Sequence, residues 1–474
     1  MKESKRLIKN TTIYALGDII PRLLGFISFP ILTRYLSPAD YGIVNYVGTL
    51  TTFLLAFGFL CINTYYLVFY YRCEDSEAQK KLLGNLSSFA ILFNLALVVF
   101  FLLFGNSLFK LFGSKITFYP YIFIGILTNF FNIFAVLPSA LFRLLEKPLL
   151  LTIINVSRGV ITLLLTLLLV VYYDYSAIGV LYVTLFVNFI YAFIFLYISR
   201  NHIIWNICLK QLKEVLRFSL PLLPGSLAYY ITTISDRILI DKYLSLSELG
   251  VYSTAVTLAL ILNIFSYGAY KAFEPYIFKN WGTEGFVEIF EKIRNAFVYV
   301  LLIGVLCLSV FSKEFFQIMS NVKFHEAYWY VPMIIIGVYS SSLSMLYSTI
   351  ITAKGKTKIN SLVSIIGATI SITLNIILLP ILGLVSAAIV SSFALTVELF
   401  ILIWYSKLEV NHKKPFFSVL IVAVAIYFSV YIFSIEQIVI AILLKTIFTF
   451  LVIVILSKTL VINPFKMINS FIIK

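Results

Sequence analysis

Charged residues are scarce in this sequence: Asp, Glu, Lys and Arg together make up 12% of its 474 residues. A soluble domain carries about 25% charged residues, so the chain has about half the charge that a surface in water requires. Cysteine and histidine are also scarce, with four and three residues, and no CxxC pair occurs. This scarcity excludes a disulfide scaffold and disfavours redox or metal chemistry. We expect the four cysteines to be small core residues; they are Cys61, Cys73, Cys208 and Cys307.

Apolar residues are abundant instead. They make up 61% of the chain, and the mean hydropathy is +1.01. Fourteen crossings of about 21 residues would need about 294 residues, close to the number of apolar residues present. The apolar runs are too long for strands and lack the alternation of a transmembrane barrel, so we expect an all-α polytopic membrane protein with about fourteen transmembrane helices. The predicted spans are residues 11–33, 41–70, 83–104, 117–141, 150–173, 177–199, 215–240, 248–279, 291–311, 328–351, 357–380, 383–406, 415–434 and 437–458.

The basic residues predict the orientation. A net charge of +15 would suggest nucleic acid in a soluble protein, but Lys and Arg collect on the cytoplasmic loops of membrane proteins. With the N-terminus inside, 26 of the 36 Lys and Arg residues fall on the inner side, 6 on the outer side and 4 within spans. Both termini are therefore expected in the cytoplasm, and no nucleic acid is expected as a partner. The first span contains Asp18 and Arg22, which predicts a retained helix and not a cleaved signal peptide.

The sequence contains an internal repeat. Residues Tyr35–Gly42 and Tyr243–Gly250 both read Y-L-S-x-x-acid-x-G at an offset of 208. Further matches at that offset, within one residue, pair Lys147 with Lys354 and Ser176–Phe186 with Gly383–Phe393. Six spans separate the copies, so both have the same orientation in the membrane and the repeat is parallel.

The repeat predicts the domain organisation. We expect an N-terminal six-helix bundle over residues 1–205, a second six-helix bundle over 206–410, and an appended helix pair with a cytoplasmic tail over 411–474. Two bundles related by an axis along the membrane normal would form a V around a central cavity. Such an architecture supports alternating access by rocking of the bundles.

Three stretches resemble a known family. Gly25–Gly42 reads GFISFPILTRYLSPADYG, and the second half contains Ser219–Gly225, SLPLLPG, followed by Ser235–Arg237. These stretches are similar to polysaccharide-precursor flippases of the multidrug/oligosaccharidyl-lipid/polysaccharide exporter superfamily. The likeness covers essentially the whole chain, including its plan of six, six and two spans. It is more specific to the superfamily than to the O-antigen or capsule branch.

The resemblance implies a function. It implies a multi-pass protein of the bacterial cytoplasmic membrane that moves undecaprenyl-diphosphate-linked oligosaccharide from the inner to the outer leaflet, for surface polysaccharide biosynthesis. Such a protein is not an enzyme, is not driven by ATP, and has no cofactor or metal. Its partners are the polyprenyl-diphosphate-linked oligosaccharide, membrane lipid and other polysaccharide-assembly proteins. The resemblance also implies that the last two spans form part of a groove for the polyprenyl tail.

Sequence patterns of nucleotide and zinc chemistry are incomplete in this chain. Gly355–Thr357 imitates the end of a phosphate-binding loop, but Ile350 occupies the position of the first glycine of that loop. His325–Glu326 would begin an HExxH zinc motif, but Trp329 stands where the second histidine is required. The sequence therefore predicts neither an ATPase domain nor a zinc site.

Ionisable residues within the predicted spans are costly to insert and mark candidate site residues. Asp18 and Arg22 share one helix face at a spacing of four. We interpret Arg22 as a ligand of the diphosphate with Asp18 orienting it; a self-neutralising structural pair is the alternative. Arg158 has no acidic residue within a helical turn, which suits a guanidinium group that binds diphosphate.

The other charges within or near spans leave more alternatives open. Asp236 and Arg237 are adjacent, so we do not expect them to pair with each other; an interfacial structural role and substrate contact are equally favoured. Lys271, near a span end, is also a candidate for substrate binding. Glu398 and Lys445 are expected to pair between the second bundle and the last span. Binding of a coupling ion or a lipid headgroup is their alternative role.

Two other functions compete with the flippase. A cation-coupled drug or metabolite exporter of the same fold would favour acidic residues in its cavity, whereas the charges within spans lean basic. A membrane glycosyltransferase or polymerase would need loop carboxylates and a large outer loop. The longest predicted outer loops hold fewer than twenty residues, which counts against an enzyme of that kind.

Overall fold

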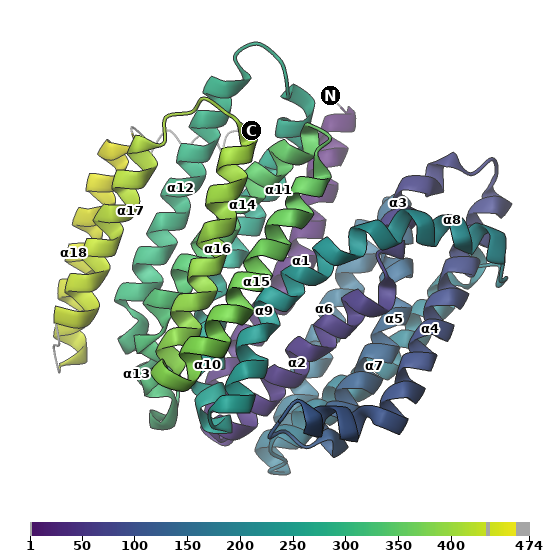
Figure 1. The fold of residues 1–474 in the computed structure, drawn as a ribbon, viewed down its shortest axis with the longest axis horizontal. Helices are drawn as coiled ribbons and strands as arrows, with labels where there is room; N and C mark the ends of the chain where they lie inside the picture. Colours follow the sequence, from purple (N-terminus) through teal and green to yellow (C-terminus); the bar gives the residue numbers. More distant parts are fainter. Residues whose placement is uncertain (1, 433–436, 461–474) are drawn as a thin grey trace. The chain divides into compact units, whose positions relative to one another are not determined.

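The computed structural model describes residues 2–432 and 437–460 (Figure 1), without the side chains of residues 2–12, 14–16, 18, 272, 275, 431 and 432. The regular structure of the described chain is helical throughout, with no strand, which confirms the all-α prediction. The helices are α1 (Lys2–Tyr35), α2 (Pro38–Phe59), α3 (Ile62–Phe69), α4 (Ser76–Leu111), α5 (Phe123–Leu144), α6 (Pro148–Leu167), α7 (Ala177–Ser199), α8 (Leu209–Ser219), α9 (Leu223–Tyr243), α10 (Leu246–Ala259), α11 (Ile261–Asn280), α12 (Phe286–Val310), α13 (Ser312–Met319), α14 (Val331–Ala353), α15 (Thr357–Leu382), α16 (Leu384–Ser406), α17 (Lys413–Ile426) and α18 (Ile438–Thr459).

Twelve helical segments of the described chain are long and apolar enough to cross a membrane. They coincide with twelve of the fourteen predicted spans, so the chain is a multi-pass membrane protein. The two remaining predicted spans, residues 11–33 and 215–240, fall in α1 and in α8 with α9. Each is the first span of one half of the repeat, and each carries charged and hydroxyl side chains that lower its hydropathy. A total of fourteen crossings stays a prediction.

Packing divides the chain into two units, residues 1–250 and 251–474, with the boundary inside α10. In the first unit α6 packs along α1, α5 packs along α7, and α9 packs against α2. In the second unit α14 is the most buried span and packs against α11, α12 and α16. The helices α17 and α18 pack on α12 and on each other. The six-helix boundary at 205/206 stays a prediction.

Two predicted spans depart from a single regular helix, to different degrees. The span predicted over 41–70 breaks at Leu60 and Cys61, which separate α2 from α3. The span predicted over 248–279 is divided only by a one-residue turn at Leu260, between α10 and α11. The first of these spans is therefore not one continuous helix, and no proline within residues 41–70 announces its break. In the second, Leu260 keeps a right-handed helical backbone, and Leu246–Asn280 still forms one candidate membrane span.

The repeated motif begins two helices in the same way. At the start of α2, the backbone N–H of Asp40 donates to Ser37 Oγ at 3.1 Å and the backbone N–H of Ser37 donates to Asp40 Oδ2 at 3.3 Å. At the start of α10, Ser245 and Glu248 form the same reciprocal pair, at 3.1 and 2.8 Å. Both copies are capping boxes, in which serine and acid satisfy backbone donors at the helix N-terminus.

The glycine that ends each copy lies at a close contact between two helices. A Cβ atom on Gly42 would lie 2.9 Å from the backbone N of Gly250, and a Cβ atom on Gly250 would lie 1.8 Å from the carbonyl oxygen of Pro38. The first turns of α2 and α10 therefore pack backbone to backbone, which only glycine permits here. The sequence repeat marks a direct contact between its two copies, within the first unit.

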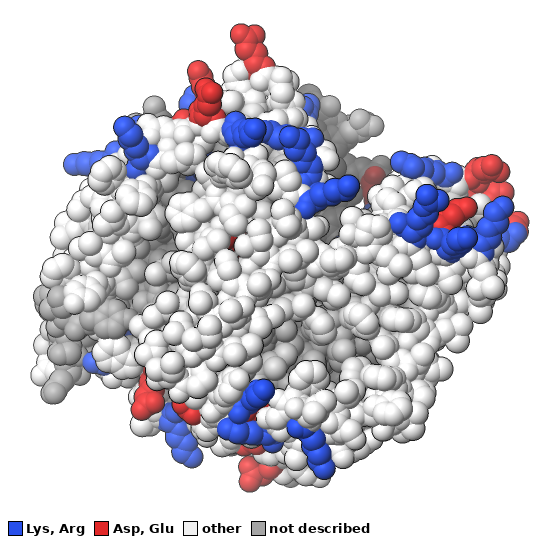
Figure 2. Space-filling view, viewed as in Figure 1, with Lys and Arg blue, Asp and Glu red and all other residues white. Residues whose placement is uncertain are grey.

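The distribution of side chains fits a membrane. On the face shown in Figure 2, Lys, Arg, Asp and Glu gather near the helix ends and the surface between them is almost free of charge. Large apolar side chains are exposed along the spans, for example Val439 and Phe450 of α18 at 70% and 65%. Such exposure is costly in water but favourable against lipid.

The cysteines are less buried than expected. Cys208, which precedes α8, is exposed, and the other three are half-buried. The expectation of four core cysteines is wrong, because Cys208 lies in a connecting segment and Cys61 lies at the break between α2 and α3.

Candidate functional site

The first unit contains a pocket of about 500 Å³ between α1 and α6, with Val180 of α7 at its edge. Small residues let the two helices approach. Gly17 lies where a Cβ atom would be 2.6 Å from Thr152 Oγ1, and Gly159 faces Pro21 and Leu24. Thr152 Oγ1 also donates to the carbonyl oxygen of Ile13 at 2.8 Å, which ties α6 to α1. The two helices that form the pocket therefore pack closely through small residues, as is typical between membrane helices.

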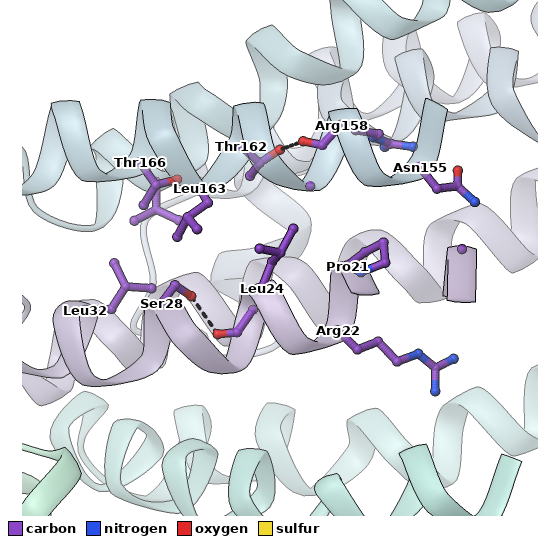
Figure 3. A pocket seen from close by; sticks show the side chains of 14 residues that line it. Pro21, Arg22, Leu24, Ser28, Leu32, Asn155, Arg158, Thr162, Leu163 and Thr166 are labelled. Atoms are coloured by element: carbon purple, nitrogen blue, oxygen red, sulfur yellow. Dashed lines mark hydrogen bonds between the residues drawn. The ribbon is translucent and has the colours of Figure 1, made fainter. Parts of the chain in front are cut away.

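Polar groups line this pocket at the level of the membrane spans. Arg22, Ser28, Asn155, Arg158, Thr162 and Thr166 contribute side chains, and Pro21 lies inside α1 next to Arg22. Pro21 has no backbone N–H, so the carbonyl of Gly17 lacks its usual helical partner. Figure 3 shows Leu24 and Leu163 between the two helices, with the polar residues distributed on both sides.

Arg158 is the most firmly positioned charge in the pocket. Its Nη2 donates to Asn132 Oδ1 of α5 at 3.0 Å and to Asn188 Oδ1 of α7. Asn188 is itself fixed, because its Nδ2 donates to the carbonyl oxygen of Thr184 at 2.7 Å. No described carboxylate lies within ion-pair distance of Arg158. Two neutral amides hold this guanidinium, and no carboxylate in the described part of the chain neutralises its positive charge.

Arg22 lines the same pocket in a different way. Its side chain is exposed, and Figure 3 shows the guanidinium pointing from α1 away from α6. The structure thus places two of the predicted site residues, Arg22 and Arg158, around one pocket. The side chain of Asp18, the predicted partner of Arg22, lies outside the described part of the structure.

The remaining predicted residues do not line this pocket. Asp236 and Arg237 are buried in α9, 4% and 8% exposed. Arg237 Nη1 donates to the carbonyl oxygen of Thr233 at 2.7 Å and lies 3.4 Å from Asp236 Oδ1. The expectation that these neighbours do not pair is wrong, because the arginine side chain folds back along its own helix. Lys271 lies on α11, in the second unit.

Lys445 has a different partner from the one predicted. Its Nζ lies 2.7 and 3.0 Å from the two carboxylate oxygens of Glu314, on α13, and donates to the carbonyl oxygen of Val310 at 2.9 Å. Both side chains are buried. The predicted pair of Lys445 with Glu398 is therefore wrong, because Glu314, which the sequence places outside the spans, reaches the buried ammonium group.

Glu398 is buried on α16 against α15. A Cβ atom on Gly367 would lie 1.8 Å from Glu398 Oε1, so the carboxyl group occupies the space that this glycine leaves. Glu398 is 8% exposed, and Oε1 has no hydrogen-bond partner among the described residues.

Sequence reasoning missed the asparagines around Arg158. Asn132, Asn155 and Asn188 lie in apolar runs, and we considered only ionisable residues as site markers. An amide in a membrane span also needs a partner, since an unpaired polar group in an apolar medium costs several kcal/mol. Asparagines within the predicted spans were therefore the sequence signal that could have identified the partners of Arg158.

These features define a class: an all-helical, multi-pass membrane protein with an arginine-lined pocket between its spans. A sequence profile described as "Polysaccharide biosynthesis protein" matches residues 7–281, more than half of the chain, and one described as "MatE" matches residues 221–377. The chain belongs to this family of polysaccharide biosynthesis proteins. The resemblance to polysaccharide-precursor flippases of the multidrug/oligosaccharidyl-lipid/polysaccharide exporter superfamily is thereby confirmed.

Individual relatives agree with this assignment. The capsular polysaccharide biosynthesis protein CapF of Staphylococcus aureus is 22% identical over 395 residues, covering 81% of this chain and 95% of CapF. An uncharacterized membrane protein of Haemophilus influenzae is 22% identical over 379 residues, covering 77% and 88%.

Solved structures share the fold. The lipid II flippase MurJ in an inward closed conformation matches 95% of this chain and 100% of its own, with a TM-score of 0.75 at 15% identity. An inward-facing multidrug resistance transporter of the MATE family matches 84% and 93%, with a TM-score of 0.62 at 13% identity. At these identities the likeness shows the fold alone.

Proposed function

We propose that this protein moves an undecaprenyl-diphosphate-linked oligosaccharide from the inner to the outer leaflet of the bacterial cytoplasmic membrane, by alternating access. The observation that carries the proposal is the state of Arg158. A cation within a membrane span is costly unless it is paired or functional. Arg158 is held by two amides and no described carboxylate, so it retains a net charge for an anionic ligand.

The unused donors of Arg158 suit a diphosphate. Its two hydrogen bonds come from Nη2, and neither Nε nor Nη1 donates to any residue that the structure describes. A guanidinium can present a planar fork of N–H groups to a phosphoryl group, and such charge-assisted bonds are about twice as strong as neutral ones. We assign Arg158 to bind the diphosphate, Asn132 and Asn188 to orient it, and Arg22 to contribute a second positive charge at the pocket.

The orientation and the partners belong to the same proposal. We propose both termini in the cytoplasm, the last two spans as part of a groove for the polyprenyl tail, and other polysaccharide-assembly proteins as partners that receive the product. Reporter fusions test the topology: a fusion at Lys210, at the start of α8, should report a cytoplasmic position. An external position would contradict the assigned orientation.

A cation-coupled exporter of drugs or metabolites is the second candidate. The MatE profile match over residues 221–377 and the buried carboxyl group of Glu398 favour it. Such an exporter would tolerate loss of Arg158, since its substrates are cations, and would be inactivated by Glu398→Gln.

Complementation separates the two candidates. Cells that lack their own copy of this chain are supplied with the wild type, Arg158→Ala or Glu398→Gln, and surface polysaccharide is measured together with the amount of each protein in the membrane. The flippase predicts that Arg158→Ala abolishes surface polysaccharide at normal abundance. Wild-type surface polysaccharide from Arg158→Ala would contradict the proposed function.

A further inference from the structure

The break in the second predicted span forms a feature that the proposed diphosphate site does not use. Leu60 and Cys61 both adopt left-handed backbone conformations, with φ of 45° and 59°. Non-glycine residues rarely adopt this conformation, and two in succession require support from their surroundings. The sequence around them contains no proline, so packing, and not local sequence, imposes the break.

An asparagine on a neighbouring helix supports the break. Asn94 of α4 is buried, and its Nδ2 donates to the carbonyl oxygens of Gly58 and Ala90, both at 2.9 Å. A Cβ atom on Gly58 would lie 2.1 Å from Asn94 Oδ1, so the amide reaches the backbone only because residue 58 is glycine. The carbonyl group that the break frees is thus satisfied by a side chain, as is required at membrane depth.

A pocket of about 270 Å³ opens at this break, inside the first unit. Its polar lining comes from α2, the break, α3 and α9, and consists of Thr52, Cys61, Asn63, Thr64, Ser226 and Tyr230. The other lining residues are apolar. The pocket shares no lining residue with the arginine pocket between α1 and α6.

The chemistry of this pocket is neutral. None of its lining residues is Asp, Glu, Lys, Arg or His. Cys61 Sγ lies 3.3 Å from Ser226 Oγ, whereas the side chains of Asn63 and Thr64 form no hydrogen bond with any described residue. Their donors and acceptors therefore remain for a ligand. A pocket that alternates hydroxyl and amide groups with apolar walls fits a ligand with many hydroxyl groups and no charge.

We propose that this pocket binds the neutral saccharide part of the lipid-linked substrate. The inference rests on the proposed function: Arg158 takes the diphosphate, and the pocket at the break takes sugar hydroxyls. The uncharged lining argues against the diphosphate itself as occupant, since an anion would find no cation there. Asn63 and Thr64 supply the hydrogen bonds, and the broken helix exposes them.

Cys61 offers a direct reporter of occupancy. In a Cys73→Ser/Cys208→Ser/Cys307→Ser background, Cys61 is the remaining thiol, and its rate of maleimide labelling is measured in protein reconstituted into nanodiscs. Undecaprenyl diphosphate carrying a short neutral oligosaccharide, at ten times its Kd, should slow labelling about tenfold, because the vacant fraction falls by a factor of 1 + [L]/Kd. Sugar-free undecaprenyl diphosphate should leave the rate unchanged. Equal protection by both ligands, or no protection by a saccharide-bearing ligand that binds, would overturn the proposal.

Binding measurements on matched variants separate this inference from the proposed function. Thr64→Val should raise the Kd of the saccharide-bearing lipid about tenfold, the loss expected for one good hydrogen bond, and leave the Kd of sugar-free undecaprenyl diphosphate unchanged. Thr49→Val, on α2 outside the pocket, is the control and should change neither. Arg158→Ala should weaken both ligands. If Thr64→Val weakens neither ligand while Arg158→Ala weakens both, the saccharide pocket is refuted and the proposed function stands; if Arg158→Ala weakens neither, the proposed function fails, and this inference with it.

Discussion

Two cations within predicted spans, one in each unit, are held in opposite ways. In the second unit Lys445 lies within 3.0 Å of both carboxylate oxygens of Glu314, and both side chains are buried. In the first unit Arg158 is held by Asn132 and Asn188, which are neutral. One arrangement cancels its own charge, whereas the other keeps a charge and fixes its direction.

This difference separates structural charges from functional ones better than depth in the membrane does. An insertion cost applies to every ionisable residue within a span, so depth alone marks all of them. A carboxylate partner reduces that cost without any ligand, and the pair then needs no further role. A cation with only amide partners still lacks an anion, and a transported diphosphate supplies one. The comparison makes four predictions, beginning with the largest effect.

The largest effect is expected for Arg158→Ala. The change removes the proposed ligand of the diphosphate but leaves two amides that can hydrogen-bond to water, so the fold should persist. Loss of two charge-assisted bonds, about 1.5 kcal/mol each, corresponds to about a hundredfold lower affinity. The rate of transport of lipid-linked oligosaccharide into the outer leaflet of proteoliposomes, normalised to protein amount, measures the effect of the substitution. A loss of transport of less than twofold would mean that Arg158 has a structural role, like Lys445, and does not bind the substrate.

The second prediction concerns the pair in the second unit. Lys445→Met leaves the Glu314 carboxylate buried without its cation, which should cost about 3–5 kcal/mol of stability. The double variant Lys445→Met/Glu314→Gln removes both charges and should recover most of that loss. Thermal unfolding in detergent measures stability, and transport by the double variant should be close to wild type. Loss of transport in a stable double variant would show that this pair is functional after all.

The sequence predicted the general architecture well because its signals are long. Runs of about twenty apolar residues identify the spans even where their ends are misplaced, and the motif repeated at Tyr35–Gly42 and Tyr243–Gly250 proved to be a pair of capping boxes in contact. The break at Leu60 and Cys61 could not be predicted, because no local residue demands it. Asn94, which supports this break, lies more than thirty residues away along the chain.

The site was predicted only in part for a related reason. Arg22 and Arg158 could be selected as charges within spans, and the structure brings both to one pocket. The partners of the charges depend on which helices are neighbours, which periodicity does not give. Lys445 was therefore assigned Glu398 in place of Glu314, and the asparagines that hold Arg158 were not considered.

The third prediction converts one arrangement into the other. Asn188→Asp would place a carboxylate against Arg158 and create in the first unit the kind of pair that Lys445 forms in the second. The stability of the protein should be unchanged or higher. Transport should fall about tenfold, because the diphosphate must now break an ion pair between Arg158 and the new carboxylate, which contributes about 1.5 kcal/mol. Asn188→Leu is the matched control that removes the hydrogen bond without adding charge, and it should have a smaller effect. Equal transport by Asn188→Asp and the wild type would refute the role assigned to the free charge.

The smallest effect is expected for Arg22→Lys. Arg22 lines the same pocket as Arg158, but its side chain is exposed and its guanidinium points away from α6. Exposed charges are better screened, and each contributes about 0–1 kcal/mol, so the change should lower transport by no more than about fivefold. Lysine keeps the charge but loses the planar fork of donors, whereas Arg22→Ala loses both. A graded series, in which the wild type exceeds Arg22→Lys and Arg22→Lys exceeds Arg22→Ala at equal abundance, would show that Arg22 contacts the anion through its donors. Equal transport by Lys and Ala variants, both below wild type, would show that the guanidinium shape matters and the charge does not. If all three transport equally, Arg158 alone supplies the cation of the pocket.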